Sequence, residues 1–237
     1  MKRTKKKRNP KTDVVLRMFG AAAGLFFFGF GVYLTIQANI GVGPWDALTL
    51  GISGTLHMQY GTVSILLSLL ILGIDVLLRG RIGVGMILDA LIVGKTVDLF
   101  NWLSPVQKMT GWFSGLLLML AGLVVEGFSL YLYMRAGLGC GPRDTLLVQL
   151  KKKLPKIPIG LISIVILAVV TLIGWKLGGP VNFGTLVCAL LTGPIMQAAF
   201  RSVRFDATGI CHQRLKESFS VFLRGLRTSR EVRASSR

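Results

Sequence analysis

The sequence predicts an all-α membrane protein built from two tandem units of about 98 residues. Three observations predict this fold: few charged residues, six long apolar stretches, and a segment that recurs within the chain. Of the 237 residues, 52% are hydrophobic and only 16% are charged, whereas about a quarter of the residues in a soluble domain are charged. A soluble protein of this composition would lack the polar residues to cover its surface, so we expect it to lie in a bilayer.

Six stretches reach the length of about 20 apolar residues that a membrane-spanning helix needs. They cover residues 16–38, 60–79, 83–103, 111–134, 157–177 and 181–201. Two shorter apolar segments, 44–56 and 142–154, would rise about 20 Å as helices, less than a hydrocarbon core of about 30 Å. We expect these two to form re-entrant half-helices, interfacial helices or short tilted spans.

The second half of the chain resembles the first. Residues 23–48 align with residues 121–146 at a constant offset of 98, with 13 identities in 26 positions. An offset of 99 then aligns pairs of glycines: Gly61 with Gly160, Gly85 with Gly184, and Gly94 with Gly193. Each unit therefore contains one long span, one short helix and two long spans. We expect six spans and an inverted-topology repeat, because this arrangement leaves fewer basic residues outside; the alternative is eight spans and a parallel repeat.

Basic residues are concentrated at the two ends of the chain. The net charge is +18, with eight of the 28 basic residues in the first 17 positions and nine after position 200. We divide the chain into a basic tail (1–15), two membrane units (16–110 and 111–204) and a basic amphipathic tail (205–237). Basic flanks orient spans and attract anionic lipids. We therefore expect a bacterial inner-membrane protein with both termini in the cytoplasm, anionic lipids as partners of the tails, and no nucleic acid.

A glycine-rich break precedes each short segment. It contains Gly41, Gly43, Pro44 and Asp46 in the first unit, and Gly139, Gly141, Pro142 and Asp144 in the second. The glycines permit a sharp turn, proline suits the first helical position, and the aspartate complements the positive helix end. This structural interpretation explains every residue of the motif. The functional alternative is that broken helices expose polar groups to a substrate, as in inverted-repeat transporters.

Several ionisable residues fall inside the long spans: Asp75, Asp89, Lys95, Asp98 and Glu126. Charged groups at membrane depth are costly, so each needs a partner or a water-filled cavity. Lys95 can pair with Asp98 on the same helix, or with Glu126 across helices. Together with the two aspartates of the glycine-rich breaks, these three residues are our candidate transport residues: Asp46, Asp144, Lys95, Asp98 and Glu126.

No motif of an enzyme, metal site or cofactor site is present in the sequence. The three cysteines have no metal-binding spacing, and no catalytic triad or phosphate-binding loop is found. We therefore predict no enzymatic activity and no cofactor. The function we expect is transport of a small molecule or ion through a wet cavity between the two units. The alternative is a membrane-bound accessory or scaffold protein with a dry, packed core.

Four segments resemble the YczE/YitT-like family of bacterial integral membrane proteins: residues 41–46, 61–64, 83–85 and 94–98. The Pro-Trp-Asp sequence at 44–46 and the glycine spacing are the most specific parts of this likeness. It covers about residues 15–201 and excludes the basic tails. The resemblance implies a multi-pass protein of the bacterial inner membrane, and it implies no catalytic residues.

Overall fold

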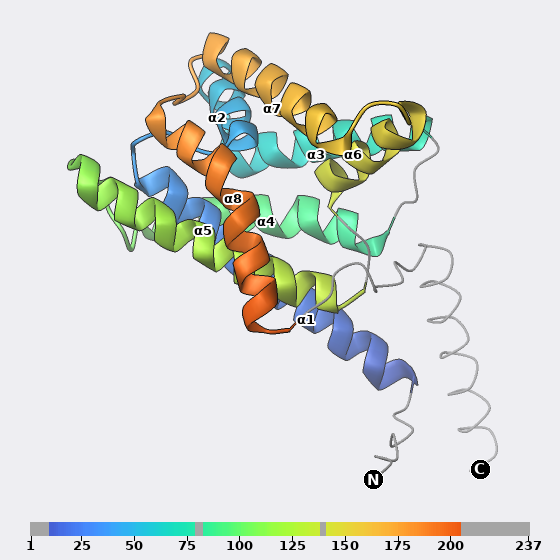
Figure 1. Ribbon diagram of the computed structural model, residues 1–237. Helices are drawn as coiled ribbons and strands as arrows, with labels where there is room; N and C mark the ends of the chain where they lie inside the picture. Colours follow the sequence, from blue (N-terminus) through green and yellow to red (C-terminus); the bar gives the residue numbers. More distant parts are fainter. Residues whose placement is uncertain (1–9, 79–82, 138–140, 205–237) are drawn as a thin grey trace, which may run out of the picture.

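The computed structural model describes residues 10–78, 83–137 and 141–204 of the chain, and these form α-helices joined by short connections (Figure 1). The tail helix predicted in residues 205–237 lies outside the described residues. The helices follow the order long, short, long, long, and then the same order again. They are α1 (Pro10–Gln37), α2 (Pro44–Leu56), α3 (Tyr60–Leu77), α4 (Val84–Leu103), α5 (Trp112–Arg135), α6 (Pro142–Lys153), α7 (Ile159–Lys176) and α8 (Phe183–Ser202).

The predicted spans and short segments match these helices within about two residues at most ends, although α1 begins earlier, at Pro10. Five of the described helices are long and apolar enough to cross a membrane: Met18–Gln37 within α1, and all of α3, α5, α7 and α8. The helix α4 also has 20 residues, but it carries Asp89, Lys95 and Asp98. Large apolar side chains are exposed on the outer faces of the spans, as a protein surrounded by lipid requires. The chain is a multi-pass helical membrane protein.

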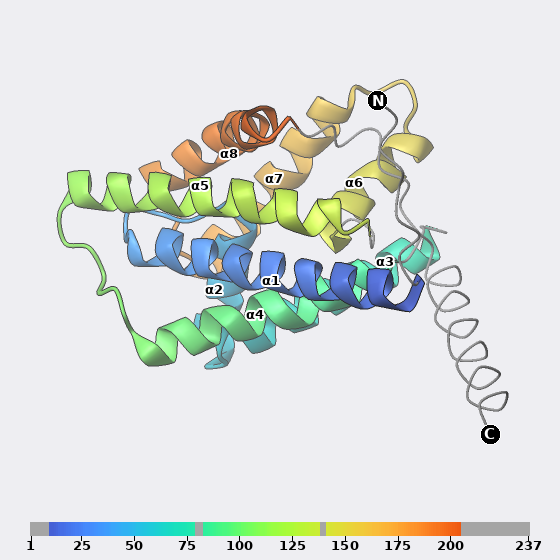
Figure 2. The ribbon, with the colours of Figure 1, turned by 90° about the horizontal axis from the view of Figure 1, so that it is seen from below.

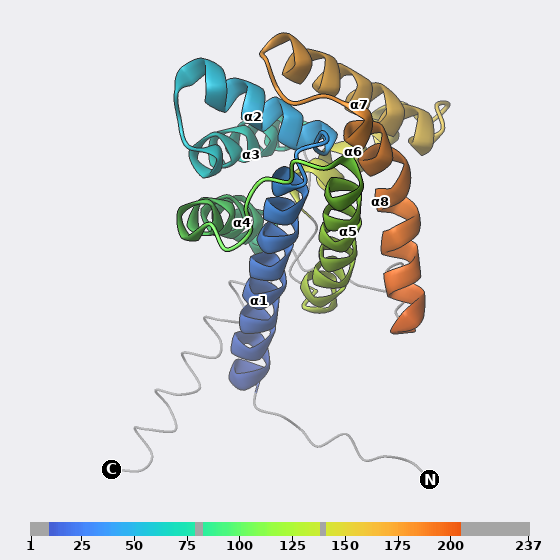
Figure 3. The ribbon, with the colours of Figure 1, turned by 90° about the vertical axis from the view of Figure 1, so that its left-hand side faces the viewer.

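The helices form two layers. One layer is a curved row of α4, α1, α5 and α8, and the other contains α2, α3, α6 and α7 (Figures 1 and 3). Within the first layer, α1 packs against α4 on one side and α5 on the other, and α5 packs against α8. The centre of the row is therefore the α1–α5 pair.

The helices α1 and α5 lie side by side and run in opposite directions (Figure 2). A methyl group added to Gly24 would lie 2.8 Å from the backbone nitrogen of Tyr133. One added to Gly31, two turns later on α1, would lie 2.9 Å from the carbonyl oxygen of Gly122, which is earlier on α5. Positions thus rise along α1 as they fall along α5. Small residues at such a contact let two helix backbones approach closely, which is a common way to join helices in membranes.

The two short helices pack against long helices from the other half of the chain. The helix α2 lies against α7, and α6 lies against α3. At the first contact, a methyl group on Gly51 would lie 2.7 Å from the carbonyl oxygen of Gly174. The hydroxyl of Thr55, on the last turn of α2, donates a hydrogen bond of 3.2 Å to the carbonyl oxygen of Leu177. The two halves are therefore interleaved.

The turn before α2 is held by the start of α8. Gly41 has φ of +116°, a backbone conformation that glycine adopts without a steric penalty. A side chain at this position would also collide with Thr185, whose backbone nitrogen would lie 2.8 Å from the added carbon. Next to it, the N–H of Gly184 donates a hydrogen bond of 2.8 Å to the carbonyl oxygen of Ile40. These contacts fix where α2 begins and where its first side chains lie.

Candidate functional site

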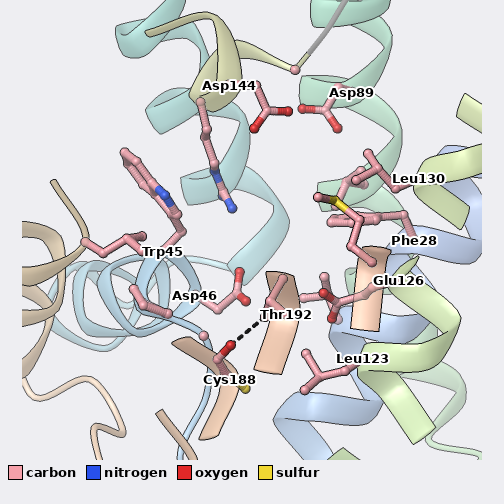
Figure 4. A pocket seen from close by; sticks show the side chains of 18 of the residues that line it. Phe28, Trp45, Asp46, Asp89, Leu123, Glu126, Leu130, Asp144, Cys188 and Thr192 are labelled. Carbon is pink, nitrogen blue, oxygen red and sulfur yellow. Dashed lines mark hydrogen bonds between the residues drawn. The ribbon is translucent and has the colours of Figure 1, made fainter. Parts of the chain in front are cut away.

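A cavity of about 490 Å³ lies between the two layers, and side chains from all eight described helices line it. Most of its wall is apolar, with leucine, isoleucine and valine side chains and the ring of Phe28. Four carboxyl groups and one guanidinium also border it (Figure 4). A cavity of this size is within the range of sites that bind small molecules, about 300–1,000 Å³.

Two of the carboxyl groups come from the first turns of the short helices. In α2, Gly43 is the N-cap, Pro44 takes the first helical position, and Asp46 follows in the first turn. In α6, Gly141, Pro142 and Asp144 have the same roles. Both aspartates line the cavity. Gly139, the first glycine of the second break, lies outside the described residues.

Asp46 and Glu126, which lies near the middle of α5, border the same part of the cavity, on either side of Thr192 in the view of Figure 4. Their carboxyl groups interact electrostatically. One oxygen of Asp46 accepts a hydrogen bond of 2.8 Å from the hydroxyl of Tyr60, at the start of α3. The Glu126 side chain is half-buried and borders the cavity. Three helices from the two halves of the chain thus meet at this pair of carboxyl groups.

The other pair consists of Asp144 on α6 and Asp89 on α4, whose carboxyl groups point toward each other (Figure 4). Both lie beside the turn that precedes α6. A methyl group on Gly141 would be 3.2 Å from Oδ2 of Asp89 and 3.7 Å from Oδ2 of Asp144. The cavity therefore has two acidic pairs, each of which includes the aspartate of one short helix.

Arg143 provides the positive charge of the cavity. Its guanidinium carbon lies 5.1 Å from the ring centroid of Trp45, a distance typical of a cation–π contact. It also interacts electrostatically with all four carboxyl groups: Asp46, Asp89, Glu126 and Asp144. Trp45 and Arg143 follow the prolines of their short helices directly. Their contact therefore joins the N-terminal ends of α2 and α6.

The two ion pairs suggested for Lys95 are not formed. Lys95 is exposed and is not part of the cavity wall. The helix α1 lies between it and Glu126, since Gly29 of α1 contacts Thr96 on α4, whereas Gly31 contacts Glu126 on α5. The physical reason is that sequence position gives the depth of a residue along a span but not the direction in which it points.

Asp98 has a different role from the one suggested by its spacing from Lys95. Its Oδ1 accepts a hydrogen bond of 2.8 Å from the N–H of Gly61, in the first turn of α3. Its Oδ2 is buried and has no hydrogen-bond partner among the described residues. Asp98 therefore joins α4 to the free amides at the start of α3, outside the cavity wall.

Of the five candidate transport residues, three line the cavity, namely Asp46, Glu126 and Asp144. Our candidate set from the sequence omitted the other ionisable and aromatic residues that surround these three in the wall, among them Trp45, Tyr60, Asp89 and Arg143. A signal for two of them was available. Trp45 and Arg143 occupy equivalent positions at the offset of 98, where one unit has an aromatic ring and the other a cation.

Comparisons with known proteins give a family but no activity. Residues 15–201 match DUF6198, which is described as a family of unknown function. The chain is 32% identical over 193 residues to the uncharacterized membrane protein YczE of Bacillus subtilis, covering 79% of this chain and 86% of that protein. It is also 28% identical to an uncharacterized protein of Haemophilus influenzae over 173 residues, 73% of this chain and 78% of that protein. The uncharacterized protein YyaS of Bacillus subtilis is 28% identical over 178 residues, with 73% and 87% covered. No solved structure matches the chain.

Proposed function

Because the chain belongs to the DUF6198 family, a family of unknown function, we propose from its own geometry that it is a membrane transporter of small molecules or ions. The observation that carries this proposal is the cavity of about 490 Å³ lined by all eight described helices. Ionisable residues inside membrane proteins typically mark substrate or ion pathways. Here five of them border one cavity, namely Asp46, Asp89, Glu126, Arg143 and Asp144.

An accessory or scaffold protein would have no need of such a cavity. Protein interiors are normally close-packed, with few voids larger than a water molecule. Three of the lining carboxyl groups, those of Asp46, Asp89 and Glu126, are partly buried. They carry a further cost, since carboxyl groups inside a membrane protein are removed from bulk water. Both costs are explained if the cavity holds a ligand during the working cycle. We therefore favour a transporter over an accessory protein and over an enzyme.

We further propose that the two halves form an inverted repeat with six spans. The antiparallel contact between α1 and α5 supports this arrangement, because these helices begin the two units. If both cross the bilayer, they enter it from opposite sides, which requires an odd number of crossings in the first unit. The reciprocal packing of α2 on α7 and α6 on α3 also fits two units that exchange their short helices. With the basic tails inside, both termini are then cytoplasmic.

A difference between the two units supports a route into the cavity. The helices α3 and α4 touch where a methyl group on Gly94 would lie 2.8 Å from the carbonyl oxygen of Gly61. The equivalent glycines of the second unit are Gly160 on α7 and Gly193 on α8, and a methyl group on either would meet no atom within 4 Å. Gly193 lines the cavity. The seam between α3 and α4 is therefore closed, and the corresponding seam between α7 and α8 is open. This difference is expected for a transporter that exposes its site on alternate sides.

The transport proposal is tested with purified protein in liposomes. The wild type and Glu126→Gln are loaded with a mixture of amines, amino acids, sugars, organic acids and inorganic salts, and the efflux of each compound is measured by mass spectrometry. We expect at least one compound to leave wild-type liposomes faster than protein-free liposomes, and the variant to lose most of that rate. If no compound leaves faster from wild-type liposomes, the proposal is refuted in favour of an accessory role.

The six-span proposal is tested separately by topology reporters. A reporter fused after Arg81 is expected to be cytoplasmic, and one fused after His57 is expected to lie outside. The reverse pattern would establish eight spans and a parallel repeat.

A further inference from the structure

The charges of the cavity wall are unbalanced. Among the residues that the structure describes, the lining contains four carboxyl groups and a single guanidinium, that of Arg143. Like charges gathered in a medium of low dielectric constant repel each other strongly, by about four times more at an effective constant of 20 than in water. One guanidinium cannot neutralise four carboxylates. The wall therefore requires additional positive charge, from protons or from a bound ligand.

The two acidic pairs come from different helices. One pair joins α2 to α5 and the other joins α6 to α4, so acidic side chains lie at the start of both short helices. In the pair at the start of α2, the second carboxyl group is Glu126, and its counterpart at the offset of 98 is Phe28. In the pair at the start of α6, the second carboxyl group is Asp89, and its counterpart at the offset of 99 is Cys188. Glu126 and Asp89 therefore do not occupy equivalent positions in the two units. The short-helix aspartate of each half is nevertheless paired with one carboxyl group from the other half.

The cavity already holds a cation against an aromatic ring. The guanidinium of Arg143 lies 5.1 Å from the Trp45 centroid, in the geometry that recognises ammonium ligands in other proteins. Phe28, Tyr60 and Tyr133 add three more rings to the wall. A positively charged group in the cavity would therefore have carboxylates and aromatic faces as neighbours.

The remaining wall is mostly apolar, with Leu25, Leu123, Leu130, Ile166 and Met196 among its members, although three serines and Thr192 also line it. A small inorganic ion would leave most of this surface without a partner. An organic molecule would cover it, and burial of apolar surface contributes about 25 cal/mol per Å² to binding. From this wall we propose that the cavity binds a small organic cation, an amine or quaternary ammonium with an apolar body. This inference rests on the proposed transport function and names its substrate class.

The test is a binding measurement that does not depend on transport. Purified protein in lipid nanodiscs is titrated with phenyltrimethylammonium and with tetraphenylphosphonium, and the midpoint of thermal unfolding is recorded. The matched anions benzenesulfonate and tetraphenylborate have similar shapes and the opposite charge. We expect both cations to raise the midpoint in a saturable manner, because a ligand that binds only the folded state stabilises it, and the anions to have no such effect.

Variants assign the effect to the cavity. Glu126→Gln and Asp144→Asn each remove one carboxylate from the wall and should weaken cation binding at least about tenfold, the effect of losing one charge-assisted contact. The matched control is Asp75→Asn, the same chemical change at a buried carboxyl group outside the cavity wall. It should bind as the wild type does. The inference is overturned if neither cation stabilises the protein, if the anions act equally, or if the cavity variants bind as tightly as the control.

This test is separable from that of transport. Cation binding without flux of any compound would retain the binding site and refute the transporter. Flux of neutral or anionic compounds without cation binding would retain the transporter and refute the substrate class.

Discussion

Substituting Gly24 by alanine tests the close contact between α1 and α5. The added methyl group would lie 2.8 Å from the backbone nitrogen of Tyr133 and 3.0 Å from the carbonyl oxygen of Ser129. Both neighbours are backbone atoms of a helix, so neither can rotate away as a side chain would. Overpacking of this kind typically costs about 1–3 kcal/mol. Alanine also favours a helix over glycine by about 1 kcal/mol, and this gain offsets part of the loss.

Gly20→Ala is the matched control, one turn earlier on the same helix. Its methyl group would have no atom within 4 Å, so only the gain in helix propensity remains. The difference between the two variants therefore isolates the steric cost, about 1–3 kcal/mol in the free energy of unfolding. Unfolding by sodium dodecyl sulfate, followed by far-ultraviolet circular dichroism, measures this difference. If Gly24→Ala unfolds at the same detergent fraction as Gly20→Ala, or at a higher one, the backbone contact between α1 and α5 is refuted.

Three further predictions concern the seams and the polar contacts. Gly94→Ala should lower the midpoint of thermal unfolding, because its methyl group would strike the backbone of Gly61. Gly193→Ala should leave this midpoint unchanged or higher, because its methyl group would meet no atom, but it should reduce flux if α7 and α8 must close together during transport. Normal flux in Gly193→Ala would contradict such a closure. Asp98→Ala should lower the free energy of unfolding by about 0.5–2 kcal/mol, because the N–H of Gly61 in the first turn of α3 loses its acceptor. Asp98→Asn keeps an acceptor oxygen and should recover most of this loss. Equal stability of the two variants would argue against the hydrogen bond from Gly61 to Asp98. Tyr60→Phe removes the donor to Asp46 and should destabilise the protein by about 1 kcal/mol, measured by the same detergent titration; an unchanged unfolding curve would show that this bond adds no stability.

The positions of the helices could be predicted from the sequence because membrane spans obey a simple length rule. Hydrocarbon thickness sets the number of apolar residues, and glycine and proline mark the ends. The short helix α2 (Pro44–Leu56) was predicted at its observed bounds, since Pro44 can begin a helix but cannot continue one. The early start of α1, at Pro10, was missed because hydropathy detects the apolar span and not its polar helical extension.

The site was predicted only in part. Asp46 and Asp144 were found because the glycine-rich breaks place them at helix ends, and Glu126 because a lone acid in an apolar span is unusual. Lys95 met the same criterion but is exposed, beyond α1. Asp89 lines the cavity, although its neighbours in the sequence do not indicate the direction in which it points. Which face of a span points inward depends on helix packing, and in membranes apolar periodicity does not report it, because lipid and protein interior are equally apolar.

The contact between α1 and α5 has a mechanical consequence. It joins two backbones at Gly24, Gly31 and Gly122, with no intervening layer of side chains to rearrange. Such a backbone contact leaves little room for relative movement, so we expect the spacing of α1 and α5 to stay fixed when other helices move. If transport opens the α3–α4 contact and closes the α7–α8 contact, distances between α1 and α5 should not change. Spectroscopic labels on α1 and α5 would then provide a fixed reference against which the motion of α7 and α8 is measured.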